Sequence, residues 1–422
     1  MKKLQSTIKL AAIALGAAMF MLTSCNKDLE TLAPITQPAP IAGTGNIGAT
    51  IASNPDDSLF YKLLQRSTLL PLLSDSSKRF TVIAVNNAGM RIAISALSGG
   101  ALPPSGAPEA FYVGAINGLP VASAAGIVSY NVIGQLLPTS LVPTRFPNTP
   151  YPSLIQLDPV NTPFLRMTTT IAKSATGNIN YVNNVPSFGA NDQVASNGII
   201  HHTFSLVAPP QKLLKDSIAN VANLSYFRAA VARADSGQNL TTTGSFNYLL
   251  SYGILNMTAL APSDAAFQTF IYTIVYGKVL QAGGSMAVAA ATAAGAVAAG
   301  PAFLATNNVT TAQVRGIIAY HLLASDATGS IAPNIRVFSV NVPTTPALVK
   351  TLVNGAAPTH PGIRAVATFG GPVTTSVTFT GFAALTGGAP FSDTPANVVS
   401  KDNQCVNGVF HVIDRVLVPL PL

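Results

Sequence analysis

A strand-like block that begins with Asn-Gly occurs twice in this chain. The first copy is NGIIHHTFSLVAP, residues 197 to 209, and the second is NGVFHVIDRVLVP, residues 407 to 419. A helix-like and a strand-like segment precede each copy in the same order. The spacing is far longer than the roughly 20–50 residues of a solenoid unit. The sequence therefore predicts two tandem modules, residues 47–210 and 211–422.

The first predicted module opens with a helix and a strand. Residues 54–73 have apolar side chains at helical spacing after a predicted cap at Asp56 or Asp57. Residues 79–90 are rich in β-branched side chains and break at a pair of asparagines, which predicts a short strand.

The second predicted module repeats this order. Residues 216–234 have apolar side chains on one helical face, which predicts one helix capped by Asp216 or Ser217. The next segment predicts a strand that stops at Pro262 and a helix that Ser263 caps. The Pro-rich segment 138–163 of the first module and the polar, Gly-rich segment 324–400 of the second are interpreted as insertions or long excursions of strand and loop.

The N-terminal residues 1–25 have the pattern of a secretory signal peptide. Two lysines precede an uncharged apolar run that is shorter than the roughly 20 residues of a membrane span. The sequence LTSC resembles a bacterial lipobox, which implies that Cys25 is acylated and attaches the chain to a lipid bilayer. Residues 26–46 are rich in Pro, Thr, Ala and Gly, which predicts a flexible tether.

The acidic and basic residues just after Cys25, in CNKDLE, bear on localisation. They resemble the short signal that sends some Gram-negative lipoproteins to the outer face of the outer membrane. We therefore expect a protein that is lipid-anchored in the outer membrane and exposed at the cell surface.

Composition excludes some functional classes. Charged residues make up only 9% of the chain and hydrophobic residues 48%. Without the three lysines of the signal peptide, the 23 basic residues become 20 against 15 acidic ones, a net charge of +5. Because these basic residues are scattered, nucleic acid is not an expected partner. Only two cysteines are present, so Cys405 is expected to be a buried small side chain outside any disulfide.

Three blocks in the second half resemble the fasciclin domain family. They are MTALAPSDAAF at residues 257–267, GIIAYHLLA at 316–324, and the final NGVFHVIDRVLVP. The first half carries divergent copies: TVIAVNNAGM, SYNVIGQLL with Asn131 in the histidine position, and NGIIHHTFSLVAPP without the Asp and Arg.

The resemblance implies an α+β fold with two tandem fasciclin-like domains, each a twisted β-wedge packed with helices. It also implies adhesion through an extracellular protein or polysaccharide partner. In animal members of the family, a tyrosine–histidine segment has been tied to receptor binding. Tyr320 and His321 occupy that position in this chain, and they are the possible binding residues.

The repeated block raises the question of catalysis, because His411, Asp414 and Arg415 lie close together in sequence. Alternate side chains of a strand point to opposite faces, so His411 and Asp414 face apart. We therefore assign both residues a structural role. The chain has no G-x-S-x-G string, and its five histidines are not at ligand spacing. We predict no enzyme activity, no catalytic residue, no metal site and no cofactor.

The favoured function is therefore that of a non-enzymatic, lipid-anchored surface protein for adhesion or docking. The alternative is a glycan-capture lipoprotein that serves an outer-membrane nutrient importer. The absence of tryptophan, which sugar-binding platforms favour, is an argument against the alternative. A hydrolase is a third hypothesis with little support in the sequence.

Overall fold

The structure is a computed structural model. It describes residues 43, 45–97, 106–143, 150–174, 180–188, 192–253, 255–306, 309–324, 335–383 and 389–419. The chain divides into two compact units, Met1–Ile41 and Ala42–Leu422, and the description below concerns the second. The predicted signal peptide, Cys25 and most of the predicted tether lie outside the described residues.

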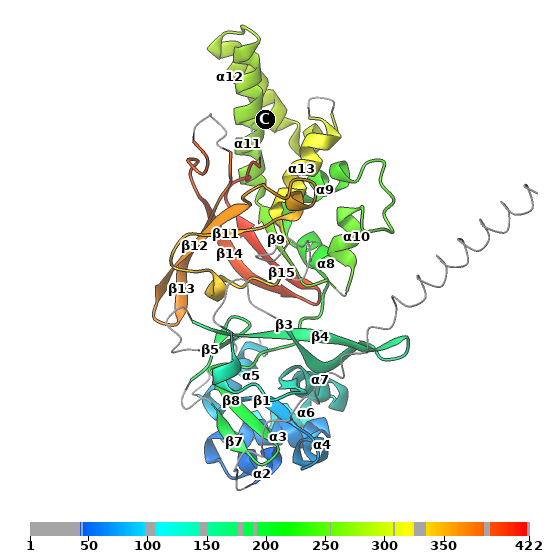
Figure 1. Cartoon of the computed structure of the whole chain (residues 1–422), viewed down its shortest axis with the longest axis vertical. Coiled ribbons are helices and arrows are strands. Elements are labelled where there is room, and N and C mark those ends of the chain that lie inside the picture. The colour runs from blue at the N-terminus through cyan, green and yellow to red at the C-terminus, as the bar shows by residue number, and fades with distance from the viewer. Residues whose placement is uncertain are drawn as a thin grey trace, which may run out of the picture. The chain divides into compact units, whose positions relative to one another are not determined.

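The first module combines helices with a sheet (Figure 1). Its helices are α2 Ile47–Ala52, α3 Ser58–Ser67, α4 Leu70–Ser74, α5 Asn87–Leu97, α6 Glu109–Gly118 and α7 Val121–Tyr130, with 3-10 turns η1 Pro55–Asp57 and η2 Thr139–Leu141. Its strands are β1 Phe80–Val85, β2 Val132–Ile133, β3 Pro150–Asp158, β4 Thr162–Lys173, β5 Asn180–Val182, β6 Val185–Pro186, β7 Gln193–Ala195 and β8 Gly198–Thr203.

The second module is built in the same way. Its helices are α8 Leu214–Ala219, α9 Ser225–Ala234, α10 Phe246–Ser251, α11 Asp264–Gln281, α12 Met286–Ala298 and α13 Thr311–His321, with 3-10 turns η3 Ala222–Leu224, η4 Gly300–Ala305, η5 Ser339–Asn341 and η6 Leu352–Gly355. Its strands are β9 Met257–Pro262, β10 Leu322–Leu323, β11 Ala347–Val349, β12 Ile363–Gly370, β13 Val373–Thr380, β14 Ala396–Cys405 and β15 Gly408–Ile413.

Each sheet has a four-strand centre of the same topology, ordered β2-β1-β8-β7 in the first module and β10-β9-β15-β14 in the second. In each, the first long strand pairs in parallel with the strand of the Asn-Gly block, β1 with β8 and β9 with β15. The two parallel pairs are buried along the whole length of all their strands, as expected for parallel strands covered on both faces. The predicted α+β fold with two modules is confirmed.

The remaining strands join this centre at different edges. In the first module β3 to β6 extend the sheet beyond β2, whereas in the second β13, β12 and β11 extend it beyond β14. Each sheet also curls back on itself, because Ser187 bridges to Thr203 and Leu323 bridges to Thr351. The insertions predicted from sequence therefore form strands that lengthen each sheet.

Helix α3 confirms the predicted amphipathic pattern, because Leu59, Phe60, Leu63 and Leu64 are all buried in the core of the first module. Asp57 occupies the N-cap position of α3, as one of the two predicted caps, but its side chain makes no capping hydrogen bond. Instead, Asn87 Oδ1 accepts a hydrogen bond of 2.9 Å from the Leu59 amide. The cap therefore comes from the residue that starts α5, which is far away in sequence.

The prediction of a single helix over residues 216–234 is also wrong. The chain forms α8, then η3, and then α9 from Ser225. Asp264 accepts hydrogen bonds from the Ser225 hydroxyl at 2.8 Å and from the Tyr226 amide at 2.9 Å. Because these bonds satisfy the start of a new helix, they stabilise the break. The predicted helix start at Ser263 is confirmed, since its hydroxyl accepts from the Ala266 amide.

Hydrogen bonds join the two modules around Arg336, which is completely buried. Its guanidinium donates to Asn256 Oδ1 at 2.9 Å, to the Val406 carbonyl at 3.0 Å and to the Thr168 carbonyl of β4 at 3.3 Å. Desolvation lowers the pKa of this guanidinium. Gln404 of β14 adds a bond of 2.7 Å to the Tyr130 hydroxyl.

Among the described residues, no single helix is long and apolar enough to cross a membrane. Helices α6 and α7 pass that test only as a pair, and they are bent by 101° relative to each other. Tyr112, Ile116, Ala124 and Val128 of this pair belong to the buried core of the first module.

Candidate binding surface

Tyr320 and His321, the possible binding residues, end helix α13 and are fully buried. The Tyr320 hydroxyl donates to the Gly362 carbonyl at 2.7 Å and accepts from the Phe382 amide at 2.9 Å. Burial raises the pKa of this phenol. A surface partner does not reach either side chain in this conformation. Their binding role stays a prediction of the family resemblance.

The His321 ring links two parts of the second module. Its Nδ1 lies 2.8 Å from the Ile317 carbonyl, and its Nε2 accepts from the Leu417 amide at 3.0 Å. Accepting at Nε2 requires the tautomer that carries the proton on Nδ1. Complete burial lowers the pKa of this imidazole to about 4.

Asn131 occupies the matching place at the end of α7 in the first module. Its amide nitrogen donates to the Ile127 carbonyl, four residues earlier, and to the Val207 carbonyl, both at 2.9 Å. His321 contacts the carbonyl four residues before it in the same way. Both side chains therefore tie the end of a helix to the segment that follows the last strand of the module.

His411 and Asp414 contact different groups. The buried His411 ring has Nε2 at 2.9 Å from the Val337 carbonyl, and its Nδ1 accepts from the Asp402 amide at 3.2 Å. Asp414 lies just beyond β15 and accepts from the Asn397 backbone and side-chain nitrogens at 2.7 and 2.8 Å. The structure does not bring His411 and Asp414 together as a hydrogen-bonded pair.

Two further histidines lie next to each other in β8 and make separate contacts. His201 Nε2 lies 2.8 Å from the Leu137 carbonyl, and burial lowers the pKa of its ring. His202 Nε2 lies 2.9 Å from a carboxylate oxygen of the buried Asp57. Sequence reasoning missed this pair, because the two residues are 145 positions apart. Among the described residues, no group of three or more His, Cys, Asp or Glu is placed to hold a metal ion.

The β3–β4 ribbon carries the most exposed large apolar side chains among the described residues. Val160, in its connecting turn, is 84% exposed, and Phe164 of β4 is 81% exposed. Figure 1 shows the tip of this ribbon reaching past the neighbouring helices of the first module. Exposed aromatic and aliphatic groups on a projecting element are typical of contact surfaces.

Asp158 builds the turn of this ribbon. Its Oδ1 accepts from the amides of Val160 at 3.2 Å and Asn161 at 3.0 Å, and Asp158 itself pairs with Thr162. Hydrogen bonds from Asn161 lower the pKa of this carboxyl. The turn is therefore ordered by its own contacts. We define Val160 and Phe164 as the ribbon tip.

Comparisons with known proteins give one kind of match. No family model matches the chain, and no curated protein sequence matches it. Among solved structures, the chain is similar to a FAS1 domain pair from the insect cell adhesion molecule fasciclin I, at 13% identity and a TM-score of 0.33. The match covers 85% of this chain and 95% of that one. A likeness at this TM-score does not bear on function, so the proposals below rest on residues and their contacts.

Proposed function

We propose that this chain is a lipid-anchored, fasciclin-like protein that mediates adhesion or docking at a bacterial surface. The acylated Cys25 would hold it to the outer membrane, and the ribbon tip would contact an extracellular protein or polysaccharide. The observation that carries the proposal is the exposure of Val160 and Phe164 on an ordered ribbon that lies outside the four-strand centre.

The contacts of the signature residues support a binding role for the insertions. Tyr320, His321 and His411 are buried, and their hydrogen bonds go to the protein backbone. The blocks of the second module that resemble the fasciclin family therefore contribute to its buried core. Surface recognition is then left to the strands and turns that differ between the modules. Among these, the ribbon carries the two most exposed large apolar side chains of the described residues.

The experiment compares attachment of bacteria that carry the gene with attachment of a deletion strain. Wells are coated with gelatin as a protein and with alginate as a polysaccharide. We expect the deletion strain to lose attachment to one of the two surfaces. The double variant V160S and F164S should attach as poorly as the deletion strain. The variant L348S, which changes a 55% exposed residue on β11, is the matched control and should attach normally.

Two results would contradict this function. One is equal attachment of the deletion strain and the parent strain to both surfaces. The other is resistance of the protein to protease added outside intact cells, since a surface protein is accessible to the enzyme. Normal attachment combined with loss of growth on a polysaccharide would favour glycan capture for an importer.

A further inference from the structure

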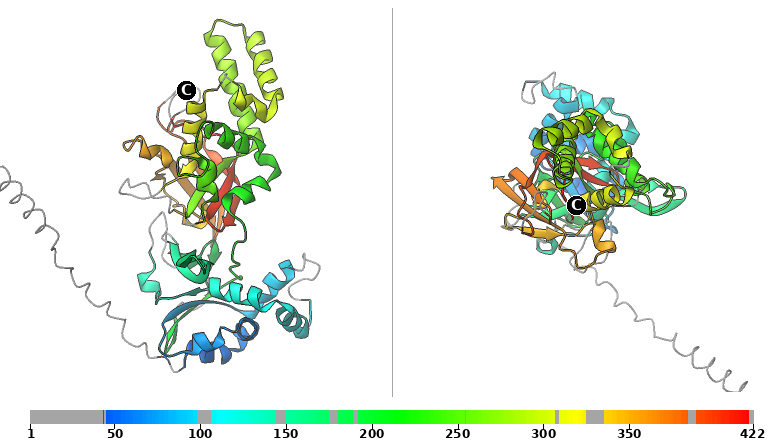
Figure 2. Two further views of the ribbon diagram at one scale, coloured as in Figure 1. Left: turned by 90° about the vertical axis from the view of Figure 1, so that its right-hand side faces the viewer. Right: turned by 90° about the horizontal axis from the view of Figure 1, so that it is seen from above.

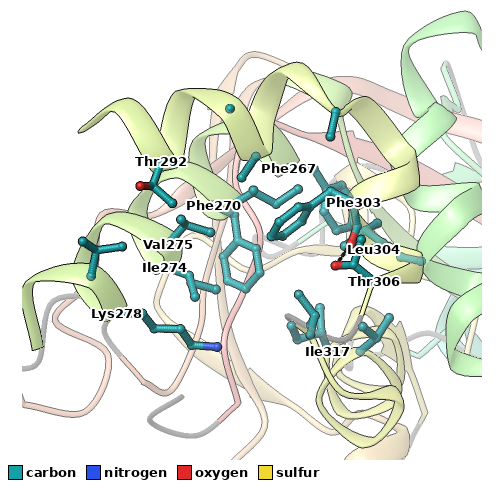
Figure 3. A pocket seen from close by; sticks show the side chains of 18 residues that line it. Phe267, Phe270, Ile274, Val275, Lys278, Thr292, Phe303, Leu304, Thr306 and Ile317 are labelled. Carbon is teal, nitrogen blue, oxygen red and sulfur yellow. Dashed lines mark hydrogen bonds between the residues drawn. The ribbon is translucent and has the colours of Figure 1, made fainter. Parts of the chain in front are cut away.

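An apolar cavity of about 470 Å³ lies in the second module between α11, α12, η4 and α13 (Figure 3). This volume lies within the range of roughly 300–1,000 Å³ that is usual for small-molecule sites. The side chains that line it are mainly aromatic or branched aliphatic. They include Phe267, Phe270, Ile274, Phe303, Val314 and Ile317.

The cavity arises from a mismatch in side-chain size along the α11–α12 hairpin, which Figure 2 shows as two helices side by side. Helix α12 turns Ala289, Ala293 and Ala296 inward. Gly295 and Ala299 also line the space. These small groups do not fill the volume opposite the large side chains of α11. Protein interiors are normally close-packed, so a void this large forgoes dispersion contacts that a hydrocarbon would restore.

The polar content of the lining is low. Its polar side chains are Lys278, Thr292 and Thr306. The two hydroxyls donate to the carbonyls of Val288 and Phe303. A buried water usually makes about three hydrogen bonds, so this lining suits hydrocarbon better than water.

Among the described residues that line the cavity, Lys278 is the one with a charged side chain. Figure 3 shows Lys278 extending from α11 toward the space below Ile274 and Phe270. An ammonium at the edge of an apolar space is placed to pair with the anionic head of an amphiphile.

We propose that this cavity binds a single-chain amphiphile with a carboxylate head, that is, a long-chain fatty acid. The hydrocarbon chain lies against Phe270, Ile274 and Ile317, and the carboxylate pairs with Lys278. The site is separate from the ribbon tip and does not depend on the proposed adhesion.

Calorimetric titration with hexadecanoate, below the concentration at which it forms micelles, tests the proposal. The protein is the full chain with Cys25→Ser, so that no acyl group of its own is present. We expect saturable binding of one molecule per chain. The absence of saturable binding would overturn the proposal.

Two glycines on the same hairpin offer a matched pair of variants. A Cβ at Gly295 or at Gly277 would meet nothing within 4 Å, so both positions accept a side chain without a clash at that atom. Gly295 lines the cavity and Gly277 does not. We expect G295L to weaken hexadecanoate binding at least tenfold and G277L to leave it unchanged. Equal effects of both variants would overturn the assignment to this cavity.

The role of Lys278 has its own control. We expect K278Q to weaken hexadecanoate binding about tenfold, because one charge-assisted hydrogen bond is lost. The same variant should leave binding of hexadecanol unchanged, since that ligand has no charge. Equal loss for both ligands, or no loss for either, would overturn the carboxylate assignment. Binding to phosphatidylcholine vesicles without binding of monomeric hexadecanoate would show a membrane contact of the hairpin instead.

Discussion

Asn197 and Asn407 make the same set of hydrogen bonds in the two modules. Asn197 Oδ1 accepts from the Ile47 amide at 2.8 Å, and its Nδ2 donates to the carbonyls of Leu73 and Asp75 at 2.9 and 3.0 Å. These bonds tie the turn before β8 to the start of α2 and the end of α4. Asn197 is completely buried.

Asn407 repeats this arrangement before β15. Its Oδ1 accepts from the Leu214 amide at 2.8 Å, and its Nδ2 donates to the carbonyls of Leu250 and Tyr252 at 3.0 and 3.2 Å. The start of α8 is thus capped by Asn407, and the predicted cap at Asp216 or Ser217 is wrong. The asparagine of each block is a distant cap for the first helix of its module.

We expect N197A and N407A each to lower the free energy of unfolding by about 3 kcal/mol, because each variant removes the three hydrogen bonds of a completely buried side chain. Urea denaturation followed by circular dichroism measures this loss. The control is N223A, which changes an exposed asparagine of η3 and should cost less than about 0.5 kcal/mol. Equal stability of N407A and N223A would contradict the capping role.

The glycine after each asparagine is required by close contact with the neighbouring strand. A Cβ at Gly198 would clash with the Phe80 carbonyl, and a Cβ at Gly408 would clash with the Met257 carbonyl. We therefore expect G198A and G408A each to destabilise the protein by about 3 kcal/mol through overpacking. G316A is the control, since a Cβ there meets nothing within 4 Å and alanine favours the helix. Thermal denaturation that ranks all three variants alike would refute this explanation of the Asn-Gly pair.

His321 should make stability depend on pH. Burial lowers the pKa of the folded imidazole from 6.5 to about 4, so the unfolded chain binds the proton more readily between these values. The contribution of His321 to the free energy of unfolding is therefore fully present above pH 6.5 and falls as the pH drops toward 4. Below pH 4 the free energy of unfolding is lower by about 3 kcal/mol.

Asn131 suggests the variant that isolates this effect. H321N places in the second module the side chain that the first module uses at the matching position, and the asparagine does not titrate. We expect the free energy of unfolding of H321N to fall less than that of the parent between pH 6.5 and 4. Parallel pH profiles of the two proteins would rule out His321 as the source.

Cys405 should be inert in the folded protein. It is completely buried, as predicted from sequence, and desolvation raises the pKa of its thiol to about 11. In the full chain with Cys25→Ser, we expect an aromatic disulfide reagent at pH 8 to form a mixed disulfide with Cys405, releasing its coloured aryl thiolate, only after urea is added. Asn223→Cys supplies an exposed thiol that should react at once. Rapid labelling of Cys405 without urea would show that the second module opens readily.

The sequence predicts the repeat, the helix start at Ser263 and the core face of α3, because each depends on residues close together in the chain. The caps of α3, α8 and α9 come instead from Asn87, Asn407 and Asp264, which reach these helices only in the folded protein. The local sequence pattern therefore missed the side chains that cap these helices. It also predicted one helix over residues 216–234, where α8 and α9 form. The ribbon tip was not predicted, because an exposed Phe164 has no periodic signal that separates it from a core residue.

The edges at which the extra strands attach also matter for protein engineering. The four-strand centre keeps the contacts of its Asn-Gly pair in both modules, while the first sheet grows beyond β2 and the second beyond β14. The same centre therefore carries additional strands at either of its two edges. A ribbon designed for one edge would leave the opposite edge of that centre unchanged, whereas replacing β4 itself would remove the bond from Arg336 to the Thr168 carbonyl.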